Sequence, residues 1–171
     1  KPVRPAGRGG EHCITSDDAF HLERLPKRAL VVGGGYIAVE FAGIFNALGV
    51  KTTLLHRGHL VLRGFDEDLR AHLTDEMRKD GIELRLSQTV DRTEKKGDAF
   101  LSYTSEGECI ETDLVLAAMG RIPDTAGLGL AEVGVELDDK GAVKVDDHYR
   151  TNIESIYAIG DVIDRVTLTP V

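Results

Sequence analysis

The fold of this chain is decided by the stretch Arg28-Ala29-Leu30-Val31-Val32-Gly33-Gly34-Gly35-Tyr36-Ile37-Ala38. Its first five residues form a short apolar run typical of a buried strand, and the glycines that follow indicate a tight turn. Residues 33–38 fit the pattern G-x-G-x-x-G/A of dinucleotide-binding proteins. In that pattern Gly33 permits the turn, Gly35 lets a pyrophosphate approach the backbone, and Ala38 lets a helix pack closely on the strand. The alternative interpretation is a plain glycine turn in an α/β fold.

A helix is predicted directly after the glycines, because apolar residues recur at helical spacing until the stop residue Gly49. These residues are Ile37, Phe41, Ile44, Phe45 and Leu48. Strand-forming residues at 51–55 then predict a second strand. The region therefore reads as strand, turn, helix and strand.

A second helix is predicted to begin at Asp66, a good capping residue, and to end at Gly81. Its expected buried face consists of Leu69, Leu73 and Met77. A third strand follows at 82–86. The alternation of strands and helices predicts an α/β fold with a Rossmann-like parallel sheet, flanking helices and right-handed crossovers.

The remainder of the chain is expected to be mainly β structure. Residues 89–113 lack a helical period and indicate a small antiparallel β-meander, and 114–118 reads as a central strand. A hairpin turn is expected at 138–141, with strand-like runs at 143–145 and 156–159.

The predicted domains are a linker and lead-in at 1–27, a nucleotide-binding Rossmann-like domain at 28–125, and a C-terminal β segment at 126–171 that is too short for a core of its own.

Composition and charge exclude several classes of protein. The chain has 171 residues, a formal charge of -8 and 42% hydrophobic residues. It contains no apolar run near the ~18 residues that a membrane span needs, and its negative charge opposes general attraction to nucleic acid or anionic lipid. Cys13 and Cys109 lie far apart in the sequence, so neither a zinc framework nor a local redox dithiol is visible, and a cytoplasmic location is expected.

The end of the second predicted strand indicates which nicotinamide cofactor is bound. An NAD site usually places Asp or Glu there to hold the ribose hydroxyls. This chain has His56 and Arg57 instead, followed by His59 and Arg63. Such a basic island in an acidic protein suits the dianionic 2'-phosphate of NADPH. The alternative is a solvated basic loop, and metal binding by the two histidines lacks an evident third ligand.

Four spaced motifs together resemble one family. They are GGGYIAVEFA at 33–42, HR at 56–57 with LRGFD at 62–66, MGRIPDT at 119–125, and IYAIGDV at 156–162. They resemble the FAD-dependent pyridine nucleotide-disulfide oxidoreductases, and within them the bacterial glutathione reductase branch; trypanothione reductases have similar motifs. The resemblance covers nearly the whole chain and implies that 28–125 is the NADPH domain and 126–171 the returning segment of the FAD-binding domain.

The resemblance also implies roles for individual residues. The cofactor-binding set would comprise Gly33, Gly34, Gly35, Tyr36, Ile37, Ala38, Glu40, Arg57, Arg63, Gly120, Gly160, Asp161, Thr167 and Thr169. Within it, Tyr36 would cover the flavin until NADPH displaces it, and Glu40 would reach toward the nicotinamide and the flavin edge. Arg57 and Arg63 would grip the 2'-phosphate. Asp161 would bind the FAD ribityl chain, Thr167 would lie near the nicotinamide, and Thr169 beside the flavin ring.

The implied reaction runs from NADPH to FAD, then to a redox dithiol and finally to glutathione disulfide. The family's redox cysteine pair, its first FAD glycine motif and its C-terminal dimer domain have no counterparts in these residues. We therefore expect this piece alone to be inactive and its parent to be a homodimer. Two alternatives remain: a relative of dihydrolipoamide dehydrogenase or mercuric reductase, and a non-catalytic NADP(H)-binding module.

Overall fold

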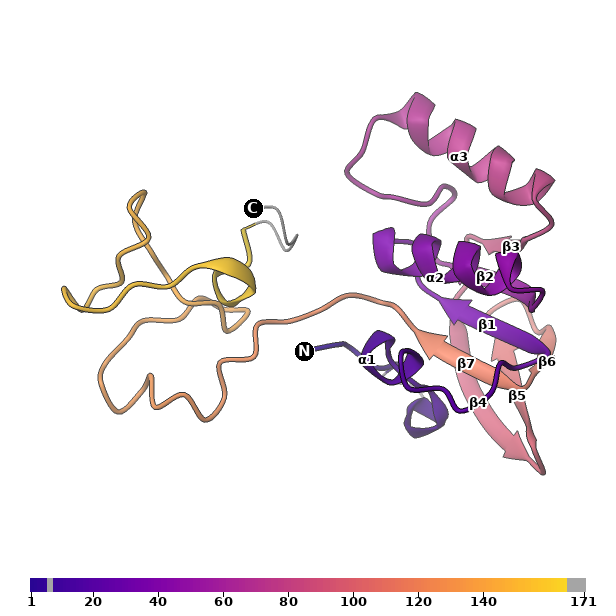
Figure 1. The fold of residues 1–171 in the computed structure, drawn as a ribbon, viewed down its shortest axis with the longest axis horizontal. Coiled ribbons are helices and arrows are strands. Elements are labelled where there is room, and N and C mark those ends of the chain that lie inside the picture. Colours follow the sequence, from indigo (N-terminus) through magenta and orange to yellow (C-terminus); the bar gives the residue numbers. More distant parts are fainter. Residues whose placement is uncertain (6–7, 166–171) are drawn as a thin grey trace. The chain divides into compact units, whose positions relative to one another are not determined.

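The computed structural model describes residues 1–5 and 8–165, and the chain forms two compact units (Figure 1). One unit is Pro2–Gly120, and the other is Lys1 with Arg121–Val171. The first unit contains all of the named strands.

The larger unit is built on a parallel sheet of the order β3-β2-β1-β7. Its strands are β1 (Arg28–Val32), β2 (Lys51–His56), β3 (Glu83–Leu86) and β7 (Leu114–Ala117). Two helices connect the first three strands: α2 (Tyr36–Ala47) follows β1, and α3 (Glu67–Lys79) follows β2. This arrangement confirms the predicted α/β fold with a parallel sheet.

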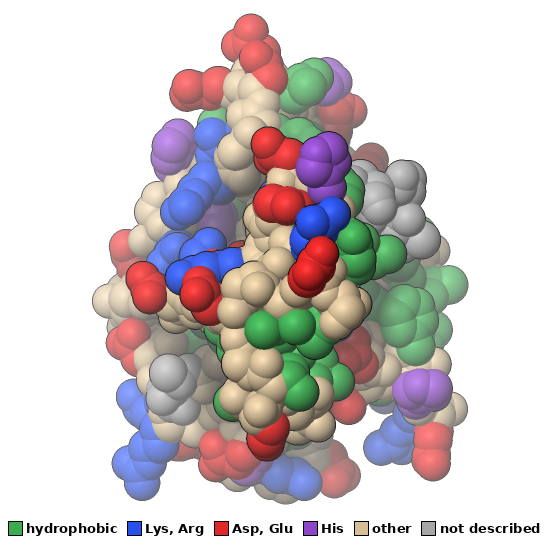
Figure 2. All heavy atoms as spheres, turned by 90° about the vertical axis from the view of Figure 1, so that its left-hand side faces the viewer, with side chains coloured by type: hydrophobic (Ala, Val, Ile, Leu, Met, Phe, Trp, Pro, Cys, Tyr) green, Lys and Arg blue, Asp and Glu red, His purple; other side chains and the backbone are tan. Residues whose placement is uncertain are grey.

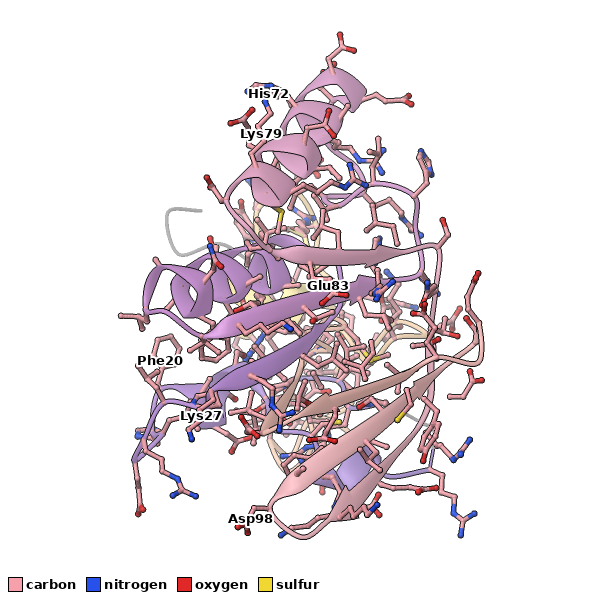
Figure 3. The ribbon with its side chains drawn as sticks, turned by 90° about the vertical axis from the view of Figure 1, so that its right-hand side faces the viewer. Phe20, Lys27, His72, Lys79, Glu83 and Asp98 are labelled. Atoms are coloured by element: carbon pink, nitrogen blue, oxygen red, sulfur yellow. The ribbon has the colours of Figure 1, made fainter. Side chains whose placement is uncertain are left out.

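A separate antiparallel sheet of the order β4-β5-β6 follows β3 in the chain. Its strands are β4 (Val90–Lys96), β5 (Ala99–Thr104) and β6 (Cys109–Thr112). Asp98 lies at the tip of the hairpin that joins the first two (Figure 3). The predicted β-meander is therefore present.

The two faces of the parallel sheet bury different layers. On β1, Ala29 and Val31 pack into one cluster with helix residues such as Phe41 and Met77. The alternate residues Leu30 and Val32 pack with Phe100 and others from the antiparallel sheet. Because successive side chains of a strand point to opposite faces, β1 is buried on both sides. This burial explains why its sequence is a continuous apolar run rather than an alternating one.

Helix α3 begins and ends as its sequence predicts, but its buried face differs. The Asp66 carboxylate accepts hydrogen bonds from the amides of Asp68 and Leu69, at 3.0 and 3.3 Å. Leu69, expected in the buried face, is 64% exposed, whereas Thr74 and Met77 are buried. Leu69 lies in the first turn and is rotated by about 80° from Met77 around the helix. The predicted face is therefore wrong at its first position.

Residues 8–20, in the stretch predicted as a lead-in, contribute to the larger unit. Ile14 forms a parallel bridge with Leu116 of β7, and Cys13 is buried in the cluster between the sheets. The short helix α1 (Ser16–Ala19) follows, with Thr15 and Asp18 forming a capping box. The segment thus extends the free edge of β7 and covers part of the core.

In the smaller unit, the expected hairpin turn is present, but the expected strands are not. Asp138 accepts hydrogen bonds from the amides of Lys140 and Ala142, both at 2.8 Å. Over 122–165 the described pairing consists of isolated bridges, Leu137 with Val143 and Arg150 with Tyr157. A short two-stranded ladder is marginal by itself, so the predicted strand-like runs remain single bridges.

The turn after β1 generates a stability prediction. At Gly33, φ is +143°, and an added Cβ would lie 2.7 Å from the carbonyl carbon of Ala118. Gly33→Ala should therefore lower the free energy of unfolding by more than ~1 kcal/mol. Gly43→Ala, in α2 and with open space around its Cβ, should raise it by about 0.5–1 kcal/mol. Urea unfolding of both variants is the measurement, and equal effects would contradict the argument.

Candidate nucleotide-binding site

The candidate site lies between β1 and β7, where the order in which the chain adds strands to the parallel sheet reverses. The chain runs outward from β1 through β2 to β3 and then returns to place β7 on the other side of β1. In open parallel sheets, ligands bind at the carboxyl ends of the two strands that flank such a point. The residues that follow β1 and β7 are Gly33 and Ala118, and the amide of Ala118 donates to the Val32 carbonyl at 2.8 Å.

Gly33 makes the tightest backbone approach of the glycine turn. Its amide donates to the Leu55 carbonyl at 2.9 Å. An added Cβ would press into the Ala118 peptide and lie 3.4 Å from the Ala38 Cβ. Ala38 is itself fully buried in the helix-side cluster, which is the cluster that contains Val31 and Phe41. The turn therefore needs glycine at position 33 and a small residue at 38, as the motif predicts.

Gly35 leaves the beginning of α2 open to an anion. It is the N-cap residue, no side chain caps the helix, and its first turn contains no acidic residue. An added Cβ at Gly35 would meet no atom within 4 Å. Helix α3 is the opposite case, because Asp66 caps it and Glu67 follows. Unsatisfied amides and the helix dipole favour negative charge, so the α2 terminus fits a pyrophosphate.

The loop after β2 is held against the glycine turn. The Leu62 amide donates to the Gly34 carbonyl at 2.6 Å. From α3, the Arg70 guanidinium donates to the Val61 carbonyl at 2.8 Å and to the Leu60 carbonyl at 3.2 Å. Val61 is fully buried in the helix-side cluster. The loop is therefore held by hydrogen bonds at residues 60–62 and by the burial of Val61 in the core.

Arg57 and Arg63 are the exposed cations of this loop. Residues 57–65 include no acidic residue, and Asp66 uses its carboxylate to cap α3. Within 1–5 and 8–165, neither arginine forms an ion pair, unlike Arg28, whose two pairs to Glu111 and Asp113 are both 2.8 Å. Figure 2 shows one face of the chain, on which acidic, basic and histidine side chains are interspersed. The formal charge of the chain is -8, so a loop with two arginines and no acidic residue is a local basic feature.

The side chain of His56 has a different role from the one that the sequence pattern suggests. The sequence pattern predicts a basic residue of the loop, but the His56 ring packs against Gly34 and is half-buried. Burial, and then the charges of Arg57 and Arg70, hold the pKa of the imidazole below its usual range. His56 is therefore a neutral packing group near pH 7. The glycine at position 34 gives it room.

The structure brings part of the predicted site together. Gly33, Gly34, Gly35, Tyr36, Ile37 and Ala38 lie at the sheet edge beside the loop of Arg57 and Arg63. Glu40 is exposed on α2, one turn beyond Tyr36, and Gly120 is exposed, with a φ of +130°. Gly160 and Asp161 are exposed at the start of η2 (Gly160–Ile163) in the other unit. Thr167 and Thr169 lie outside the described residues.

Sequence reasoning missed one residue of this site and the role of another. Arg70, which anchors the loop from α3, was not predicted, and His56, predicted as part of the basic island, fills the space beside Gly34. Arg70 looks like an ordinary surface residue of an amphipathic helix. The glycines at 34 and 58, on either side of a histidine in space, are the only sequence signal for His56.

Neither cysteine has the surroundings of a reactive pair. Cys13 is buried, and burial raises its pKa to about 11, whereas Cys109 is exposed on β6. Among residues 1–5 and 8–165, no helix is long and apolar enough to cross a membrane. The same residues contain no group of three His, Cys, Asp or Glu side chains that could hold a metal ion.

Comparison with known proteins shows the family. Residues 3–171 match the family described as pyridine nucleotide-disulphide oxidoreductase. The chain therefore belongs to this family.

Relatives in the family include disulfide reductases with different substrates. A glutathione reductase from Burkholderia cepacia is 52% identical over the whole chain, which spans 38% of that relative. A trypanothione reductase from Trypanosoma congolense is 49% identical over 95% of the chain and 34% of the relative. Among solved structures, the flavoprotein disulfide reductase RclA from Escherichia coli has a TM-score of 0.92 at 29% identity, with 99% of this chain and 40% of that chain covered. The chain thus spans between about one third and two fifths of the length of these proteins.

The cysteine environments generate a labelling prediction. At pH 8, iodoacetamide should modify Cys109 at least ten times faster than Cys13, because thiolate is the reacting form and the pKa of Cys13 is raised to about 11. Mass spectrometry of tryptic peptides over time is the measurement. In urea the two rates should converge. Equally rapid labelling in the folded chain would contradict the placement of Cys13 in the core.

Proposed function

We propose that this chain is the NADPH-binding portion of a flavin-dependent disulfide reductase that passes electrons from NADPH through FAD and a redox dithiol to glutathione disulfide. The observation that carries the proposal is the arginine loop tied to the glycine turn through Leu62 and Gly34. Family membership supports the reaction class. When bound, NADPH supplies a hydride and FAD accepts it.

Different residues of the larger unit would bind different groups of the nucleotide. The exposed Gly35 and the amides of the first turn of α2 would hold the pyrophosphate. Arg57 and Arg63 would hold the 2'-phosphate, for which their planar guanidinium groups are suited. The missing acid after β2 removes the partner that an NAD ribose would use. The donor set therefore fits NADPH better than NADH.

The remaining parts of the proposal rest on the relatives. Both named reductases act on disulfides, and glutathione is favoured over trypanothione by the higher identity, 52% against 49%, and by the complete coverage of this chain. In the smaller unit, Gly160 and Asp161 are exposed and would contribute to the FAD site together with Thr169. We further propose a homodimeric parent protein in the cytoplasm.

Relatives of dihydrolipoamide dehydrogenase or mercuric reductase, and a non-catalytic NADP(H)-binding module, are less well supported. The two arginines at the 2'-phosphate position argue against the first class. Gly160 and Asp161, which the module would not need, argue against the second.

The double variant Arg57→Met/Arg63→Met tests the cofactor assignment. Charge-assisted hydrogen bonds contribute about 1.5 to 3 kcal/mol each, so losing both should raise the Kd for NADPH by roughly two to four decades. The Kd for NADH should change little. Calorimetric titration of the 171-residue chain with both cofactors gives these values.

The matched control is Arg24→Met/Arg78→Met, which removes the same charge from exposed positions away from the loop. It should leave both affinities within about twofold, because distant surface charges are screened by salt. Equal weakening of NADPH and NADH by the loop variant would overturn the 2'-phosphate assignment. So would equal effects of the loop and control variants.

Gly35→Ala tests the pyrophosphate position. Its Cβ would meet no protein atom within 4 Å, and the φ of Gly35 is -82°, so the variant should fold with nearly unchanged stability. The added methyl group would occupy the space of the approaching phosphate and weaken both NADPH and NADH by about tenfold or more. Unchanged binding of both cofactors would contradict the site.

A further inference from the structure

The imidazole of His56 occupies a space that two glycines create. A Cβ added to Gly34 would lie 2.5 Å from the ring atoms Cδ2 and Nδ1, and one added to Gly58 would lie 2.7 Å from Nε2. Real Cβ atoms do not approach so closely. The ring is therefore packed between the glycine turn after β1 and the loop after β2.

This position joins the two parts of the nucleotide site. On one side, Gly34 is the middle residue of the glycine turn, and its carbonyl accepts the Leu62 amide. On the other side, Arg57 follows His56 directly in the chain. The His56 carbonyl accepts the Gln88 amide at 3.1 Å, so the backbone at this point is also held by the residues after β3. A change of charge on this ring would act on both parts of the site.

The charges that face His56 are positive. Arg57 comes from the same loop and Arg70 from α3, and both disfavour protonation of the imidazole. The glycine turn contributes no ionisable side chain, and the amide of Gln88 is uncharged. A dianionic phosphate held by Arg57 would bring the first negative charge to this set. An opposite charge within about 4–6 Å of an imidazole favours its protonated form.

We propose that His56 is a positioning residue that couples binding of a 2'-phosphorylated nucleotide to the uptake of one proton. The inference rests on the proposed function. In the free chain, the neutral ring packs between Gly34 and Gly58. When the nucleotide binds, a proton from solvent goes to an imidazole nitrogen, and the resulting cation adds to the field of Arg57 and Arg70. No bond other than this N–H is formed, and no group is oxidised or reduced.

The direct test is an NMR titration of the His56 ring protons in the full chain. The probes are 2',5'-ADP, which carries the 2'-phosphate, and 5'-ADP, which lacks it. The His56 titration midpoint should rise by at least one pH unit with 2',5'-ADP and stay unchanged with 5'-ADP. His72, exposed on α3 (Figure 3), is the internal control and should not move with either probe.

The affinity test compares wild type, His56→Gln and His72→Gln for 2',5'-ADP at pH 6 and pH 8. A group whose pKa is raised on binding strengthens binding as the pH falls. The ratio of the Kd of His56→Gln to that of wild type should therefore be about three- to tenfold larger at pH 6 than at pH 8. Taking this ratio cancels the titration of the phosphate itself. His72→Gln should give a ratio that does not depend on pH.

The outcomes separate the two proposals. If wild type binds 2',5'-ADP no better than 5'-ADP, the proposed function fails, and the coupling fails with it. If wild type prefers 2',5'-ADP through Arg57 and Arg63 but the His56 midpoint does not move, only the coupling is overturned. If His56→Gln does not fold, the titration of wild type decides the question without it.

Discussion

The close approach of two backbone segments at Gly33 and Ala118 is the constraint on which the site depends. It places the ends of β1 and β7 side by side at the point where the strand order of the sheet reverses. Only a residue without a side chain fits there with a φ of +143°. Because the turn is this tight, α2 begins immediately beyond it and points its first amides outward at Gly35. The tight turn at Gly33 thus both brings β7 next to β1 and exposes the helix amides that could bind an anion.

The second part of the site is organised by packing rather than by sequence proximity. The loop after β2 is fixed by the buried Val61, by Arg70 of α3 and by the hydrogen bond from Leu62 to Gly34. Its two exposed arginines therefore belong to a loop that packing and hydrogen bonds hold in place in the free chain. A preformed cationic site requires less ordering when an anion binds, and this is the physical basis of the proposed preference for NADPH.

The sequence predicts the elements of the larger unit well, because its apolar runs and glycine stops are local signals. The prediction from sequence fails where the position of a side chain depends on a contact with a residue far away in the chain. Leu69 is apolar and correctly spaced, yet it faces solvent, because the buried side of α3 is set by residues such as Thr74. The packing of Ile14 on β7 and of His56 on Gly34 joins residues far apart in the chain. No spacing rule reports such contacts, so the basic loop was predicted, but its anchors were not.

The central claim is that one nucleotide binds across the glycine turn and the arginine loop together. Amide hydrogen exchange of the 171-residue chain with and without saturating NADPH tests it most directly. The account predicts slower exchange in peptides that cover both 33–38 and 56–64, and unchanged exchange in the β4–β5 hairpin. Protection of the hairpin or of 126–165, without protection of both segments of the proposed site, would contradict it.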